Sequence, residues 1–272
     1  MGVELTFLLI MLLIGIAAGI LGALFGIGGG LFIVPALTLI LGLTTKEAAA
    51  ISLVSIVATS VGGTVFYLDN KVANIRLGLL LEISTVIGAI IGALLSAYMD
   101  DWVVTLIFII VLIISATRML LNMKTEIKDD PDGKFLFHDV KTGNDIRYDL
   151  KNEKAGFVTC SLAGAISSLV GVGGGLIKVP VMNTVMGVPM KVATATSSYM
   201  IGITAFSGAI IFFLRGDIIL DVAAFTAIGT FIGAMVGSRL SKKFDGSSMK
   251  RYFSILIFVV AMMMVLRLGG VM

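Results

Sequence analysis

The chain has 272 residues, of which 58% are hydrophobic and only 14% charged. Soluble domains are typically about 45–50% apolar and about 25% charged, so this composition excludes an ordinary soluble domain. A net charge of +3 without a basic block argues against a nucleic-acid partner. With one cysteine, Cys160, and one histidine, His138, we expect no disulfide within the chain, no metal site and no cofactor.

The apolar residues fall in long runs, as in membrane spans. The first run lacks the basic region and cleavage site of a signal peptide, so we expect it to be retained as the first membrane segment. Segments are expected at residues 5–25, 31–43, 48–68, 77–99 and 102–122, and again at 155–170, 176–188, 192–214, 218–240 and 252–268. The sequence therefore predicts an all-α integral membrane protein with two five-segment halves, residues 1–123 and 155–272.

The two halves repeat each other at a constant offset of 145 residues. The matching positions include Gly26 with Gly171, Gly28–Gly30 with Gly173–Gly175, Pro35 with Pro180, Ser52 with Ser197, Thr59 with Thr204, and Gly88 with Gly233. One register across the whole half indicates an internal duplication.

Loop charges predict that the halves are inverted. The loop "SAYMDDW" at 96–102 has two aspartates and no basic residue, whereas its counterpart "SRLSKKFDGSSMKR" at 238–251 has five basic residues. The positive-inside rule places the first loop outside and the second in the cytoplasm, which is an inverted-topology repeat. We therefore expect a multi-pass protein of the cytoplasmic membrane with a cytoplasmic linker and both termini outside.

The polar linker spans residues 124–154. Phe135, Phe137, Ile146 and Tyr148 alternate with polar residues on either side of "KTGN". This pattern predicts a small cytoplasmic β-hairpin, with a solvated tether as the alternative. We expect His138 to be an exposed side chain without a chemical role.

Two glycine-rich sequences interrupt the apolar runs. Residues 3–43 would form a helix of about 60 Å, twice the roughly 30 Å of a bilayer core, so the chain must turn at "GIGGG". Two alternatives remain: a helical hairpin that turns at the far surface, and a re-entrant loop that turns at mid-depth.

In the re-entrant alternative these glycines form an anion site. Glycine permits close approach of a ligand to the backbone, and the start of the following helix attracts anions. Inversion would bring the two breaks together. The candidate residues are Gly28, Gly29, Gly30, Gly173, Gly174 and Gly175. Close helix packing is the alternative for these glycines, and a dinucleotide site is excluded because no strand precedes either motif.

The sequences "GIGGGLFIVP" and "GVGGGLIKVP", followed by "LGLTTKEAAAIS" and "MGVPMKVATATSS", resemble the paired motifs of the sulfite exporter (TauE/SafE) permease family. The resemblance spans nearly the whole chain. It implies a secondary transporter that moves sulfite, sulfoacetate, other sulfonates or organic anions by alternating access. The second half has Thr196 before Ser197 where the first has Ile51 before Ser52, so we expect an asymmetric site with a more polar second half.

Hydroxyl side chains within the spans are candidate anion ligands, since they donate hydrogen bonds to oxygen. Ser52 and Thr59 share one helical face, and Ser197 and Thr204 repeat that pattern. The residues proposed for direct contact in the second half also include Thr196 and Ser198. Hydrogen bonding between helices or to their own backbone is the alternative for all of these hydroxyls.

Three further polar residues have two readings each. Lys178, where the first half has Ile33, either supplies positive charge to an anion or extends to the cytoplasmic surface. Asn183 is either a ligand or an interhelical hydrogen-bonding residue. Glu82 lies either at the interface or deeper, where it becomes a candidate for proton coupling.

The sequence has no nucleotide-binding motif, so we expect transport to be driven by gradients, with H⁺ or Na⁺ as candidate coupling ions. Besides the lipid bilayer, a small anion is the expected partner, and homo-oligomerisation stays open. An anion channel is the alternative function. An intramembrane enzyme is disfavoured because the spans contain no histidine and no paired carboxylates.

Overall fold

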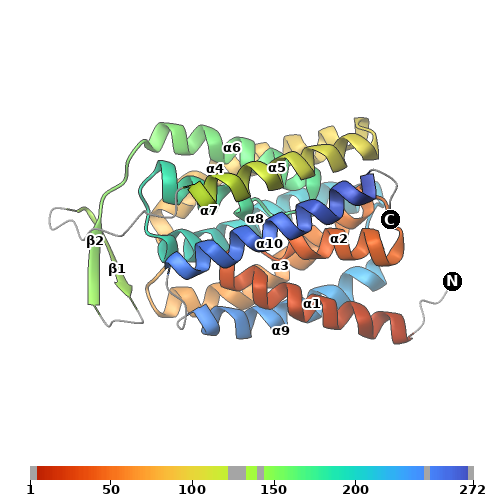
Figure 1. Ribbon diagram of the computed structural model, residues 1–272, viewed down its shortest axis with the longest axis horizontal. Helices are drawn as coiled ribbons and strands as arrows, with labels where there is room; N and C mark the ends of the chain where they lie inside the picture. The colour runs from red at the N-terminus through yellow and green to blue at the C-terminus, as the bar shows by residue number, and fades with distance from the viewer. Residues whose placement is uncertain (1–4, 122–132, 140–143, 242–245, 269–272) are drawn as a thin grey trace.

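The computed structural model describes residues 5–121, 133–139, 144–241 and 246–268. It is an elongated helical bundle with a β-hairpin at one end and both chain ends at the other (Figure 1). The helices are α1 (Leu5–Phe25), α2 (Gly30–Leu41), α3 (Thr45–Asp69), α4 (Ile75–Leu95), α5 (Asp101–Leu121), α6 (Glu153–Val170), α7 (Gly175–Pro180), α8 (Met190–Arg215), α9 (Leu220–Leu240) and α10 (Gly246–Leu268). Short 3₁₀ and π turns follow α4 and α7 at Ser96–Tyr98 and Val181–Val185.

Within the described residues, five helices are long and apolar enough to cross a membrane: α1, α3, α4, α8 and α9. Shorter apolar helices are Gly30–Leu41, Asp101–Ile114 and Ile257–Leu266. The expected all-α integral membrane architecture is confirmed.

Local capping sets where the central helices begin. Thr44 accepts a hydrogen bond from the Glu47 backbone, and the Glu47 carboxylate accepts one from the Thr44 backbone at 3.0 Å. This capping box starts α3 at Thr45, three residues before the expected boundary. Asn74 caps α4 in a related way, since its Oδ1 accepts from the Leu77 backbone at 3.0 Å.

The helix packing is the same when each helix is replaced by its counterpart in the other half. Helix α1 lies along α9 as α6 lies along α4, while α3 and α8 contact each other at the centre and α5 contacts α10. Glycines allow the outer pairs to approach closely, because a Cβ at Gly19 would overlap Thr230 of α9 and one at Gly88 would overlap Ser161 of α6. The second role expected for glycine, close packing, is thus present at these positions.

Equivalent positions of the two halves lie at opposite ends of the bundle. Ser96 accepts a hydrogen bond at 3.0 Å from Arg215, where α8 ends. Its counterpart Ser241 directly follows α9, which ends at the hairpin end of the bundle (Figure 1). This arrangement supports the expected inverted repeat, whose orientation in a membrane stays a prediction.

The linker forms the hairpin that was one of its two alternatives. Strands β1 (Phe135–Asp139) and β2 (Asn144–Tyr148) pair antiparallel, with Phe135 opposite Tyr148. Tyr148 is buried, and its hydroxyl accepts a hydrogen bond at 2.7 Å from Asn74 in the α3–α4 loop. His138 pairs with Asp145 on the exposed surface at 2.9 Å. Residues 124–132 and 140–143 of the linker, the termini, and the basic residues 242 and 243 lie outside the described ranges.

Candidate functional site

The two glycine breaks turn the chain in the same way. Gly26, Gly28 and Gly29 have φ values of 70°, 80° and 83°, and the second break repeats them with 76°, 80° and 73° at Gly171, Gly173 and Gly174. Residues with side chains rarely adopt this backbone conformation. Glycine at these positions therefore lets the chain fold back directly after α1 and α6.

Both breaks lie halfway along the bundle, against each other. A Cβ on Gly30 would overlap the Gly171 carbonyl oxygen, and one on Gly175 would overlap that of Gly26. Gly28 and Gly173 both face Ile56, which lies near the middle of α3. The geometry supports the re-entrant alternative, since the 12 residues of α2 extend about 18 Å, shorter than the roughly 30 Å of a bilayer core.

Two serines hydrogen-bond the backbone carbonyls of these breaks, and each serine belongs to the opposite half of the repeat. Ser52 of α3 donates a hydrogen bond at 2.6 Å to the Gly171 carbonyl, and Ser197 of α8 donates one at 2.7 Å to the Gly26 carbonyl. Non-helical backbone at membrane depth needs such partners. The hydrogens of these two hydroxyls are thus used to shape the backbone, which matches the alternative of interhelical bonding over direct contact with an anion.

Other predicted ligands have partners of their own. Thr59 donates to the Ser55 carbonyl of its own helix at 2.9 Å, and Asn183 donates to the Val188 carbonyl at 2.8 Å. Thr196 accepts from the Asn74 backbone at 2.9 Å. Ser198 differs, because its buried hydroxyl has no hydrogen-bond partner in the described part of the chain.

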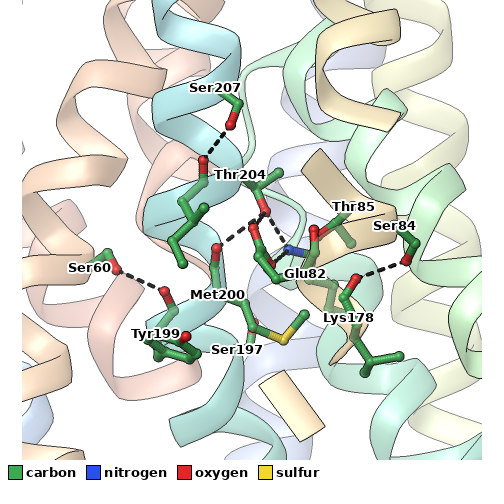
Figure 2. A network of polar contacts seen from close by, with 12 residues as sticks. Ser60, Glu82, Ser84, Thr85, Lys178, Ser197, Tyr199, Met200, Thr204 and Ser207 are labelled. Atoms are coloured by element: carbon green, nitrogen blue, oxygen red, sulfur yellow. Dashed lines mark hydrogen bonds and ion pairs between the residues drawn. The ribbon is translucent and has the colours of Figure 1, made fainter. Parts of the chain in front are cut away.

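A buried ion pair lies beside the second break. The Lys178 ammonium is 3.2 Å from Glu82 Oε2 and donates a hydrogen bond to Thr204 Oγ1 at 2.6 Å. Thr204 in turn donates to Glu82 Oε1 at 2.5 Å. Figure 2 shows the three side chains converging from α7, α4 and α8. Lys178 is 0% exposed and Glu82 4%, so both charged groups are enclosed by the protein and Lys178 does not extend to the protein surface.

The lysine is placed by the break itself. Lys178 lies in the short helix α7, and its backbone N–H bonds the Gly174 carbonyl at 2.8 Å. A Cβ on Gly174 would lie 3.3 Å from Lys178 Cε and 3.4 Å from Ser167 Oγ. The missing side chain of Gly174 therefore leaves room for the lysine stem next to a serine hydroxyl.

The cluster of Lys178, Glu82 and Thr204, the polar centre, has charged residues from only one position of each repeat pair. At the equivalent positions of the other half, Lys178 is replaced by Ile33 and Glu82 by Ala227, while Thr59, the counterpart of Thr204, bonds only its own helix. Charge thus accompanies the second break alone, and the first break lacks a comparable group. The second half is thus the more polar one at these positions, as the sequence of the two halves indicates, while an anion site at the glycine breaks stays a prediction.

Several buried hydroxyls near this centre were missed by the sequence reasoning. Ser167, Ser168 and Thr194 are buried, and within the described ranges their hydroxyls have no hydrogen-bond partner. The counterparts of these residues are Gly22, Ala23 and Ala49. The sequence signal that would have identified them is a polar residue in one half whose equivalent position in the other half has a small or apolar residue.

No group of three or more His, Cys, Asp or Glu side chains gathers among the described residues in a way that could hold a metal ion. The centre instead combines one ammonium, one carboxylate and a hydroxyl, all of them buried.

Membrane-length helices packed around two glycine breaks and a buried ion pair define a multi-pass helical membrane protein. The family model described as sulfite exporter TauE/SafE matches residues 11–264. The chain belongs to this family, and the resemblance read from its motifs is confirmed.

Relatives of full length are membrane transporters by name. The probable membrane transporter protein YunE of Bacillus subtilis is 25% identical over 92% of this chain and 94% of its own. A probable membrane transporter protein of Haemophilus influenzae is 28% identical over 96% and 99%. Sulfite exporter TauE/SafE family protein 3 of Arabidopsis thaliana is 31% identical over 40% of this chain and 25% of the plant protein. No solved structure matches. The chain thus belongs to a family of membrane transporters.

Proposed function

We propose that the protein is a secondary transporter that moves small sulfur oxyanions, sulfite and sulfonates first among them, by alternating access of its two halves. The observation that carries this proposal is Lys178, a fully buried ammonium beside a glycine break at the centre of the bundle. A buried ammonium is unfavourable without an anionic partner, so this position selects for negative charge. The family's description as sulfite exporters makes sulfite the first anion to test.

The proposed contacts all come from the second half. Lys178 supplies the charge, Thr204 and Ser167 supply hydroxyls, and Gly173–Gly175 leave the backbone accessible. A sulfite or sulfonate group has three oxygens, which suits one ammonium and two hydroxyl donors without a second fixed charge.

We place the protein in the cytoplasmic membrane with the hairpin in the cytoplasm. The hairpin end of the bundle carries most of the basic residues near helix ends, among them Lys71, Arg76, Lys151, Lys191 and Arg239. Basic residues near spans mark the cytoplasmic side.

Uptake of radiolabelled sulfite and methanesulfonate into proteoliposomes tests the function. We expect saturable uptake and counterflow, in which an excess of unlabelled anion on one side drives labelled anion to accumulate there. Flux without saturation or counterflow would instead indicate a channel. Absence of flux for every small anion under an imposed gradient refutes the proposal.

A matched pair of variants tests the site. Lys178→Met combined with Glu82→Gln removes the ammonium without leaving an unpaired buried charge, and we expect it to abolish uptake. Ile33→Met changes the equivalent buried position of the other half and should leave uptake near wild type. Wild-type uptake in the double variant would show that the site lies elsewhere.

A further inference from the structure

We propose that the proton is the coupling ion and that Glu82 carries it: its carboxylate holds Lys178 when the site is empty, and its protonation gives Lys178 to the substrate anion. This inference rests on the proposed transport function and names the coupling of that same site. It follows from the geometry of the Lys178–Glu82 pair, in which both carboxylate oxygens of Glu82 already have hydrogen-bond partners.

The substrate and Glu82 compete for the same hydrogen-bond donors. Both carboxylate oxygens are engaged, Oε2 with the Lys178 ammonium at 3.2 Å and Oε1 with the Thr204 hydroxyl at 2.5 Å. An oxyanion that binds these two groups must take the place of the carboxylate. Glu82 thus occupies the position of an anion within its own binding site (Figure 2).

Displacement of an ionised Glu82 would leave a buried charge without a partner. Such a charge is strongly unfavourable, and buried groups take up a proton instead. Lys178 is the only basic side chain that pairs with Glu82 among the residues described. Tyr199 on α8 and Cys160 on α6, two further titratable groups near the pair, supply no positive charge. Protonation is therefore the step that lets Glu82 release Lys178.

The charges balance for one proton per anion. The empty site contains an ammonium and a carboxylate, with a net charge of zero. The loaded site contains the ammonium, a monovalent anion and a neutral carboxylic acid, which is again zero. Uptake of a monovalent anion should therefore be electroneutral, whereas a dianion would carry one negative charge across the membrane.

The same geometry disfavours Na⁺. In transporters with broken helices, unwound backbone carbonyls commonly coordinate Na⁺. Here the Gly26 and Gly171 carbonyls accept the hydroxyls of Ser197 and Ser52 instead. The carboxylate that remains faces an ammonium, which repels a cation.

The test uses the purified protein in proteoliposomes with radiolabelled methanesulfonate, an anion that does not titrate near neutral pH. We expect an acidic exterior to drive accumulation, the lumen to acidify as measured with pyranine, and a potassium diffusion potential to have no effect. Uptake that follows a Na⁺ gradient and ignores the pH gradient would overturn the coupling while leaving transport intact. Absence of any flux or counterflow would instead count against the transport function.

Glu82→Gln removes the exchangeable proton and retains the neutral shape of the acid. We expect this variant to lose accumulation driven by the pH gradient but to retain counterflow. Glu153→Gln, at an exposed carboxylate in the first turn of α6, is the matched control and should keep both. Accumulation driven by pH in Glu82→Gln at the wild-type level would overturn the inference.

A measurement on the wild type decides the case even if Glu82→Gln fails to fold. Methanesulfonate is added to the detergent-solubilised protein in weak buffer, and proton uptake is followed with a pH indicator. We expect about one proton taken up per anion bound, from the charge balance of a neutral site. Anion binding without proton uptake would contradict the proposal.

Discussion

The Lys178–Glu82 pair makes a quantitative prediction about stability, because removal of one partner should be much more harmful than removal of both. At the observed 3.2 Å, two unit charges attract by about 5 kcal/mol at an effective dielectric constant of about 20. Loss of one partner of a buried pair typically costs about 3–5 kcal/mol. We expect Lys178→Met to lower the free energy of unfolding by that amount, since Glu82 would keep only the Thr204 hydroxyl.

The double variant Lys178→Met/Glu82→Gln should recover most of this loss, to within about 1–2 kcal/mol of wild type, because neutral groups often replace a buried pair at little cost. Ile33→Met at the equivalent position should change stability by less than about 1.5 kcal/mol. Unfolding by sodium dodecyl sulfate in mixed micelles, followed by circular dichroism, measures all three variants. Equal destabilisation in the single and double variants would refute the reasoning, because it would mean that Glu82 is not charged in the folded protein.

Four further variants test the breaks and the hairpin by the same unfolding measurement. Gly30→Ala should lower the free energy of unfolding by several kcal/mol, on the order of an overpacked core, because the added Cβ would overlap the Gly171 carbonyl. Gly63→Ala is its control and should be neutral or stabilising, because the added Cβ would meet only Ala23 at 3.3 Å. Similar losses of stability in both variants would contradict the close contact of the breaks. Ser52→Ala should cost about 1–3 kcal/mol because it leaves that carbonyl buried without a partner, so an unchanged midpoint would argue against the crossed bond. Burial raises the pKa of Tyr148 to about 12 against the opposing hydrogen bond from Asn74; its contribution to stability should be complete below pH of about 10, the unfolded pKa, and be lost as pH rises towards about 12, a loss that Tyr148→Phe should not show.

Much of the fold follows from the sequence because hydropathy and duplication act over long stretches. Apolar runs located the spans, and the 145-residue offset related Gly26 to Gly171 and Ser52 to Ser197. The depth of the breaks did not follow, because a surface hairpin and a re-entrant loop leave the same loops on the same sides. Contact between the two breaks, which depends on packing across the repeat, distinguishes them.

The site was only partly predictable for a related reason. Lys178 and Glu82 are 96 positions apart in sequence, so no local pattern joins them. The burial of Glu82 depends on Lys178 and Thr204, which reach it from α7 and α8. The hydrogen-bond acceptors of Ser52 and Ser197 could not be predicted either, because a serine hydroxyl donates equally well to an anion or to a carbonyl. Which acceptor it meets depends on the backbone that packs next to it.

The crossed serine bonds have a consequence for biosynthesis. The Gly26 carbonyl enters the membrane 171 residues before the Ser197 hydroxyl that bonds it. Until α8 has been made, the Gly26 carbonyl lacks this hydrogen-bond partner, and an unpaired carbonyl is costly if it lies at membrane depth. The N-terminal half is an unfinished folding unit when it leaves the ribosome, and helices made late in translation complete its interior.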